Sequence, residues 1–168
     1  MEVLEYHPTT WEKVFATEVN NLRFNLPKFR FNIEHIGATS VNNCRTFRNV
    51  DILLSVHDFK DIYTISMILQ SKEYREVKEM STVDCVVLSR KAKLYGCGVT
   101  LRIVQHASPT YNRFICFQIY LKESFTRVMK YNEFRETLFE QVKYNINEYN
   151  KVKYDYINSL IDENFKFE

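Results

Sequence analysis

Glycine and proline are scarce in this chain, with three of each among 168 residues. Because these residues interrupt regular structure most strongly, their scarcity predicts long helices and strands with few long loops. The chain also lacks a continuous run of the roughly 20 apolar residues that a membrane-spanning helix needs. Its first five residues include two glutamates and no apolar signal core, so we expect a cytoplasmic protein with no membrane partner.

An excess of charge of one sign is absent as well, since 23 Lys and Arg residues nearly balance 21 Asp and Glu residues. No block of like charge stands out, and the sequence therefore shows no evident nucleic-acid-binding surface. The cysteines form no C-x-x-C pair and have no nearby histidine to complete a zinc pattern, which favours free thiols in a reducing compartment. The four cysteines are Cys44, Cys85, Cys97 and Cys116.

What is present is the balance of a globular protein. Hydrophobic residues make up 45% of the chain and charged residues 26%, and the length suits one domain over residues 1–168. Apolar spacing predicts a helix that starts at a capping box, Thr9–Glu12, and stops at Pro27. Strands are expected over 31–36, 50–56, 83–89 and 99–105, and further helices after Asp58, after Ser124 and from Asn147. Residues 114–121 fit a short helix or a strand. This order predicts an α+β fold, a mixed sheet with helices packed mainly on one side.

The most informative local pattern is a strand that runs into a glycine and then into small hydroxyl residues. Gly37 allows close approach of a ligand to the backbone, and Ala38 continues the turn. Thr39 and Ser40 supply hydroxyl and N–H groups at the start of the next helix, an arrangement that suits phosphate or another anion. The same two residues also suit a simple helix cap, and the two roles are compatible.

A lone carboxylate follows on the next strand. Asp51 stands among apolar residues of alternating pattern, so its side chain is expected to point away from the core. It is a candidate metal ligand beside the phosphate turn, and the alternatives are an exposed strand carboxylate or an ion-pair partner of Arg48. His35 is a candidate proton carrier, with a hydrogen-bonded strand histidine as the alternative. A second carboxylate is needed for two-metal chemistry, and Asp84 and Glu34 are the nearby candidates.

A longer stretch carries a family resemblance. Ile33–Val41, which reads IEHIGATSV, with Asp51-Ile52 in register, closely resembles the GrpB family, whose motif is E-H-I-G-S-T-S-V-P-G-L, then K-P, then a D-I strand. The opening Tyr6-His7-Pro8 and the closing Tyr149–Lys153 are also similar, so the resemblance extends over nearly the whole chain. It implies a nucleotidyltransferase-like fold, a nucleotide or phosphate site, and Mg²⁺ held by Asp51.

The departures from the family pattern concern the same site. Ala38 stands in place of a serine, and Arg48 keeps a basic group one position later than the family's lysine. Arg102 replaces a histidine on a later strand. A guanidinium cannot act as a base or bind a metal, but it can pair with Asp51 or bind an anion. Lys153 matches a late lysine of the family, and it either reaches over the pocket or sits on a solvated face.

These patterns support two hypotheses about function. In the first, the chain moves a nucleoside monophosphate from a nucleoside triphosphate to a small acceptor, with Mg²⁺ on Asp51, unless the departures have switched the activity off. In the second, it is a non-catalytic domain that binds a nucleotide, another phosphate-bearing small molecule, or a protein. The sequence leaves the acceptor and the oligomeric state open.

Overall fold

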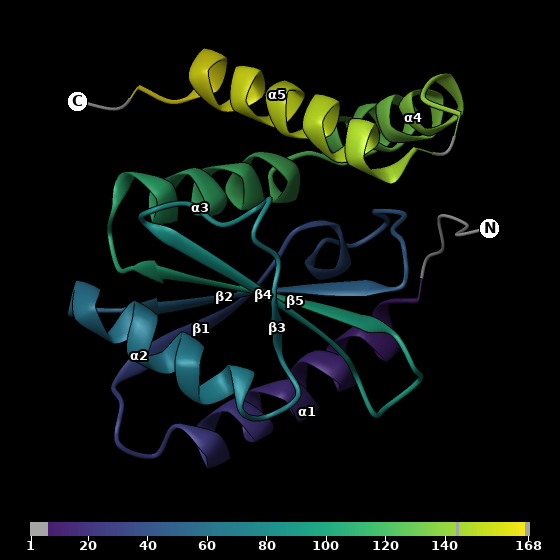
Figure 1. The fold of residues 1–168 in the computed structure, drawn as a ribbon. Helices are drawn as coiled ribbons and strands as arrows, with labels where there is room; N and C mark the ends of the chain where they lie inside the picture. The colour runs from purple at the N-terminus through teal and green to yellow at the C-terminus, as the bar shows by residue number, and fades with distance from the viewer. Residues whose placement is uncertain (1–6, 144, 167–168) are drawn as a thin grey trace.

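The computed structural model describes residues 7–143 and 145–166. Tyr6 and the acidic opening residues lie outside these ranges. Within them the chain forms a five-stranded sheet and five α-helices (Figure 1). The elements are α1 (Pro8–Asn25), β1 (Phe31–Ile36), the 3-10 turn η1 (Ala38–Ser40), β2 (Asn49–Val56), α2 (Phe59–Gln70), β3 (Arg75–Glu76), β4 (Cys85–Lys91), β5 (Gly98–Gln105), α3 (Pro109–Lys122), α4 (Phe125–Gln141) and α5 (Ile146–Asn164).

The sheet is mixed and has the strand order β1-β2-β5-β4-β3. β1 is antiparallel to β2, β2 is parallel to β5, and β4 is antiparallel to β5 and β3. β2 and β5 lie inside the sheet and are covered on both sides. β2 is buried from Ile52 to Val56, whereas β5 alternates buried apolar residues with the half-buried Thr100 and Arg102. This arrangement confirms the predicted α+β class with a mixed sheet.

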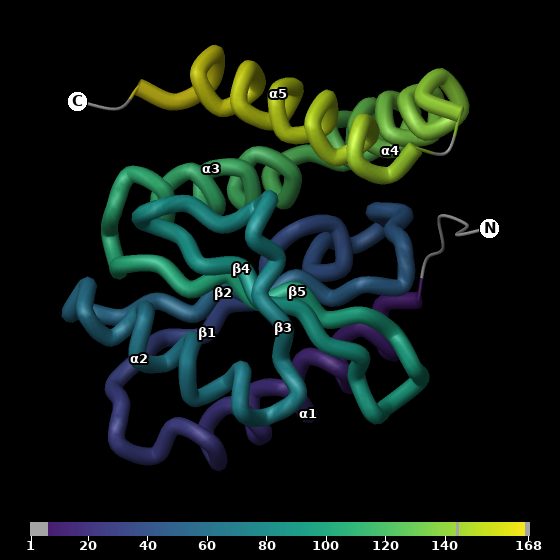
Figure 2. Tube along the Cα trace, in the orientation of Figure 1, coloured from purple at the N-terminus to yellow at the C-terminus, as the bar shows by residue number. Residues whose placement is uncertain are grey.

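Helices cover both faces of the sheet rather than mainly one (Figures 1 and 2). α1 and α2 pack on one face through an aliphatic core that includes Ile52, Leu54 and Leu101, all fully buried. α3 packs on the other face against a smaller cluster that includes Leu53 and Val87. α4 and α5 then pack on α3 as a further helical layer. The expectation of helices mainly on one side was wrong, because β2 directs apolar side chains to both faces of the sheet. Ile52 and Leu54 point to the α1 face, and Leu53 points to the α3 face.

Helix boundaries follow the local capping chemistry. Asp58 caps α2, since its side chain accepts a hydrogen bond from the backbone N–H of Lys60 at 2.9 Å. The predicted capping box at Thr9–Glu12 is wrong, because the helix begins at Pro8 with His7 as its N-cap. The final helix begins at Ile146, one residue earlier than expected, and Asn145 is its N-cap. None of the five described helices combines the length and apolar character that crossing a membrane requires.

Candidate functional site

Gly37 and Asp51 are neighbours across β1 and β2. Ile36 pairs with Asp51 in the antiparallel register, so the residue after β1 lies directly beside the carboxylate. Gly37 has a φ of 71°, and a Cβ atom at this position would lie 3.1 Å from Asp51 Oδ2. Glycine is thus required twice here, for its backbone conformation and for the space that the carboxylate occupies. The backbone N–H of Gly37 donates to Gln118 Oε1 on α3 at 3.0 Å, which fixes the turn.

Asp51 is already paired with a cation. In the parallel register Leu53 lies beside Arg102, two residues further along the same face of the sheet as Asp51. Arg102 Nη1 donates to Asp51 Oδ1 at 2.6 Å, and both side chains are largely shielded from solvent. The guanidinium also lies over the ring of Phe114, with its central carbon 5.4 Å from the ring centroid. The ion pair that the sequence suggested is therefore confirmed.

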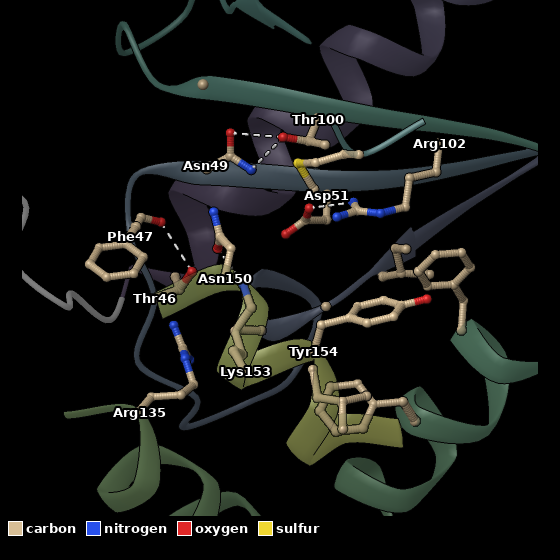
Figure 3. Close-up of a pocket in the computed structure, with 18 of the residues that line it drawn as sticks. Thr46, Phe47, Asn49, Asp51, Thr100, Arg102, Arg135, Asn150, Lys153 and Tyr154 are labelled. Atoms are coloured by element: carbon tan, nitrogen blue, oxygen red, sulfur yellow. Dashed lines mark hydrogen bonds and ion pairs between the residues drawn. The ribbon is translucent and has the colours of Figure 1, made fainter. Parts of the chain in front are cut away.

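A large cavity opens in front of this ion pair. It has a volume of about 910 Å³ and lies between the α3 face of the sheet and the layer formed by α4 and α5. Figure 3 shows that polar groups enter it from several elements, with Asn49 and Thr100 on the strands and Asn150 and Lys153 on α5. Asn49 Nδ2 donates to Thr100 Oγ1 at 3.0 Å across β2 and β5. The cavity has the size of a site for a whole small molecule.

The lining of the cavity is strongly cationic. Among the described residues that line it, Asp51 is the sole acid, against seven basic residues, which are Arg48, Arg90, Lys91, Arg102, Arg113, Arg135 and Lys153. Two of the seven are committed elsewhere. Arg90 turns its side chain toward α1, where its Nε lies 3.7 Å from Glu18 Oε1. Arg113 pairs with Asp162 at 2.9 Å. Arg48 also lines the cavity and is exposed.

Arg135 is a buried arginine of this cavity that the sequence analysis missed. Only 3% of its surface is exposed. Its Nε donates to the hydroxyl of Tyr149 at 3.0 Å, and its Nη1 donates to the backbone carbonyl of Arg45. No carboxylate of the described residues lies within ion-pair distance of it. A signal was available, because Arg135 lies four residues after Tyr131 and three before Leu138, on the buried stripe of α4.

Lys153 also lines the cavity without a carboxylate partner among the described residues, and unlike Lys91 its side chain is largely shielded from solvent. Its Nζ donates to Asn150 Oδ1 at 3.2 Å and lies 5.2 Å from the ring centroid of Tyr149. Burial lowers the pKa of Lys153 to about 8, Asp51 opposes this shift, and the charges of Arg135 and Arg102 add to it. Lys153, which matches a late lysine of the family pattern, therefore reaches into the cavity rather than into solvent.

Thr39 and Ser40 lie apart from this cavity, although the sequence predicted Asp51 beside their turn, and His35 lies apart from it as well. His35 points to the opposite face of the sheet, where its ring stacks on Phe15 of α1 with centroids 4.6 Å apart. Its Nε2 lies 2.8 Å from Thr39 Oγ1, and burial lowers the pKa of His35 to about 4. These three residues line a separate cavity of about 50 Å³. The proposed proton carrier is thus a neutral histidine on the far side from Asp51.

The turn separates the predicted phosphate-binding residues because η1 rotates their side chains away from one another. Gly37 and Ala38 line the large cavity with Asp51. Thr39 is buried, and Ser40 donates its hydroxyl to the backbone carbonyl of Gly37 at 2.8 Å. The amide of Gln118 donates to the same Ser40 hydroxyl. The hydroxyl groups of this turn therefore close the local structure instead of facing a ligand.

Neither candidate for a second carboxylate lines the cavity. Glu34 Oε1 accepts a hydrogen bond from the hydroxyl of Tyr111 at 2.9 Å. Asp84 accepts hydrogen bonds from Thr82 at 2.7 Å and from Thr110. Over residues 7–143 and 145–166 no group of three or more His, Cys, Asp and Glu side chains is arranged to hold a metal ion.

The fold and the cavity define a mixed α+β domain with a cationic site between its sheet and a helical layer. A model of the GrpB protein family matches residues 1–163, and this chain belongs to that family. The conserved protein GrpB from Enterococcus faecalis is similar in structure, with a TM-score of 0.79, 22% sequence identity and 96% of each chain covered. This match shows the fold, which confirms the family resemblance of the sequence motif.

The polymerase core of TRAMP, an RNA surveillance complex, is a more distant structural neighbour. Its TM-score is 0.49 and its sequence identity 8%, and the match covers 77% of this chain and 41% of that one. A likeness of this degree carries no argument about activity. No curated protein matches the sequence.

Proposed function

We propose that this GrpB-family protein binds the phosphate groups of a nucleotide, or of another phosphate-bearing small molecule, in the 910 Å³ cavity, and that it does so without nucleotidyl transfer. The observation that carries the proposal is the pair of cations, Arg135 and Lys153, that reach this cavity without a carboxylate partner among the described residues. Phosphate and carboxylate are the anions that form charge-assisted hydrogen bonds with such groups.

The electrostatics of the unliganded cavity support this function. Taking a charged group out of water costs free energy unless an opposite charge compensates it. The pKa of Lys153 is lowered to about 8 because burial and two neighbouring guanidinium groups outweigh the single carboxylate of Asp51. An anion in the cavity supplies the missing negative charge, and it stabilises the protonated form of this lysine.

The donor set does not fit a resident Mg²⁺. Magnesium prefers oxygen ligands in an octahedral arrangement, commonly one or two carboxylates together with substrate phosphates. Asp51 is the only acid among the described lining residues, and its Oδ1 accepts a hydrogen bond from Arg102. Two-metal phosphoryl transfer needs carboxylates that bridge or flank the ions. Arg102, where the family pattern has a histidine, contributes positive charge to the cavity but neither a base nor a metal ligand.

The first experiment measures binding by isothermal titration calorimetry, with ATP and tripolyphosphate as ligands and without divalent metal. Lys153→Met removes one cation from the cavity, and we expect it to weaken binding about 10- to 100-fold, the range for a hydrogen bond to a charged group. Lys60→Met makes the same chemical change at an exposed position of α2, on the opposite side of the sheet, and is expected to leave binding unchanged. Equal affinities of the two variants, or no binding by the native protein, would contradict the proposal.

The second experiment tests the absence of transfer. The protein is incubated with each labelled nucleoside triphosphate, Mg²⁺ or Mn²⁺, and cell extract as the source of acceptors, and pyrophosphate release is measured. We expect no release above that of the protein-free control. Robust release that disappears in Asp51→Asn would show that the site is an active nucleotidyltransferase and that the Arg102–Asp51 pair opens to admit metal.

A further inference from the structure

The same cavity is lined by apolar and aromatic side chains as well as by cations, and Arg102 and Arg135 lie over two of the rings, Phe114 and Tyr131. Phe114, Phe117 and Tyr131 line it from α3 and α4, and Ile157 and Ile161 line it from α5. The volume of about 910 Å³ lies within the range of sites that enclose a whole small molecule, and it far exceeds what phosphate groups need. A ligand that contacts both the cationic and the apolar side chains of the cavity therefore carries an apolar or aromatic group in addition to its phosphates.

Tyr154 is the most exposed of the aromatic side chains that line the cavity. It lines the cavity from α5, and 52% of its surface is exposed (Figure 3). Within the described part of the chain its hydroxyl has no hydrogen-bond partner and its ring stacks on no other ring. By contrast, Tyr149 and Tyr131, the other tyrosines near Lys153 and Arg135, are buried. Tyr154 follows Lys153 directly and lies four residues after Asn150, so it belongs to the cavity face of α5.

From this arrangement we infer that the ligand is a nucleoside di- or triphosphate, and that Tyr154 stacks on its base while Lys153 and Arg135 bind its phosphates; the inference rests on the proposed function. Base–aromatic stacking needs an exposed π-face next to a cationic track for the phosphates, and it tolerates any of the four bases. The cavity supplies both features on one helix face. Cations on β5, α4 and α5 surround the space, which suits a ligand with more than one phosphate.

The test compares ATP, GTP, CTP and UTP with tripolyphosphate by calorimetry in the native protein, Tyr154→Ala and Tyr154→Phe. We expect the nucleotides to bind more tightly than tripolyphosphate. Tyr154→Ala should lower the affinity for nucleotides about 10-fold and leave the affinity for tripolyphosphate unchanged, and Tyr154→Phe, which keeps the ring, should bind as the native protein does. Phe24→Ala is the matched control, because Phe24 is 84% exposed on α1, away from the cavity.

The outcomes separate this inference from the function beneath it. If tripolyphosphate binds as tightly as the nucleotides and Tyr154→Ala changes neither, the base site is wrong and phosphate binding stands. If Tyr154→Ala weakens the binding of nucleotides and of tripolyphosphate equally, Tyr154 contributes to phosphate binding and the stacking role is also wrong. If neither nucleotides nor tripolyphosphate bind the native protein, the proposed function itself fails.

Discussion

The two faces of the sheet differ sharply although the same strands make both. On the face toward α1 and α2, Ile52, Leu54 and Leu101 are fully buried in a continuous aliphatic core. On the face toward α3, α4 and α5, Asp51 and Arg102 stand at alternate positions of the same two strands and border a cavity. The strand period of two therefore directs neighbouring residues to opposite faces, so that one residue packs in the aliphatic core and the next borders the cavity.

The cavity face is also the one that carries unfavourable electrostatics. Arg135 and Lys153 lie there without carboxylate partners among the residues that the structure describes, whereas the α1 face places its buried Arg90 beside Glu18 and Tyr74. Binding sites often retain arrangements that are unfavourable for the free protein, since the ligand completes them. The comparison thus predicts that replacing a core side chain of the α1 face lowers the free energy of unfolding, whereas replacing Lys153 of the cavity raises it.

The largest effect is expected in the aliphatic core. Leu101→Ala removes a fully buried side chain and should lower the free energy of unfolding by about 2–5 kcal/mol. Thr100→Ala changes the adjacent residue, which faces the cavity, and loses only its hydrogen bond to Asn49, about 1 kcal/mol. Urea denaturation of the two variants measures both values. Similar losses for both would show that the cavity face is as tightly packed as the core.

The second prediction concerns pH and His35, which the register of β1 places on the α1 side. His35 has a pKa of about 4 in the folded protein and about 6.5 when unfolded, so the unfolded chain binds more protons between these values. Folding stability should therefore fall as the pH is lowered from about 6.5 to 4, by on the order of 2 kcal/mol.

His35→Gln should flatten the pH dependence of the urea midpoint over this interval. His57→Gln, at an exposed histidine, serves as the control and should keep the native slope. A native slope in His35→Gln would mean that other groups cause the acid sensitivity.

The smallest effect is expected from the lysine of the cavity. Its lowered pKa, about 8, means that the folded protein disfavours the charged form, and Lys153→Met should raise the stability of the ligand-free protein at pH 7 by about 1 kcal/mol. The native protein should gain stability between pH 8 and 10.5, where the unfolded chain still holds this proton, and the variant should not. Thermal melts across this range check both statements, and a destabilised Lys153→Met at pH 7 would contradict them.

Much of the strand geometry of the site was predictable from the sequence, because the alternation of a strand fixes the face to which each side chain points. The isolated Asp51 on an apolar strand pointed away from the α1 core as expected, and Arg102 paired with it. The direction of His35 follows from the strand register, which pairs it with Ile52 of the α1-side core, whereas the direction of Ser40 depends on the 3-10 turn and was not predictable. Arg135 was not identified from the sequence as a cavity residue. Its contact with the backbone of Arg45 depends on how α4 packs against a segment far away in the sequence.

The position of α5 has a consequence for the motions of the free protein. This helix packs mainly on α3 and α4, while its Lys153 and Asn150 face the cavity rather than a packed core. Helices held by few buried contacts open locally more often than central strands, and their amide hydrogens exchange faster with solvent. Amides of α5 should accordingly exchange faster than those of β2 in the free protein. A ligand that bridges α5 and the sheet should slow α5 preferentially, so that ligand occupancy can be followed along the backbone of this one helix.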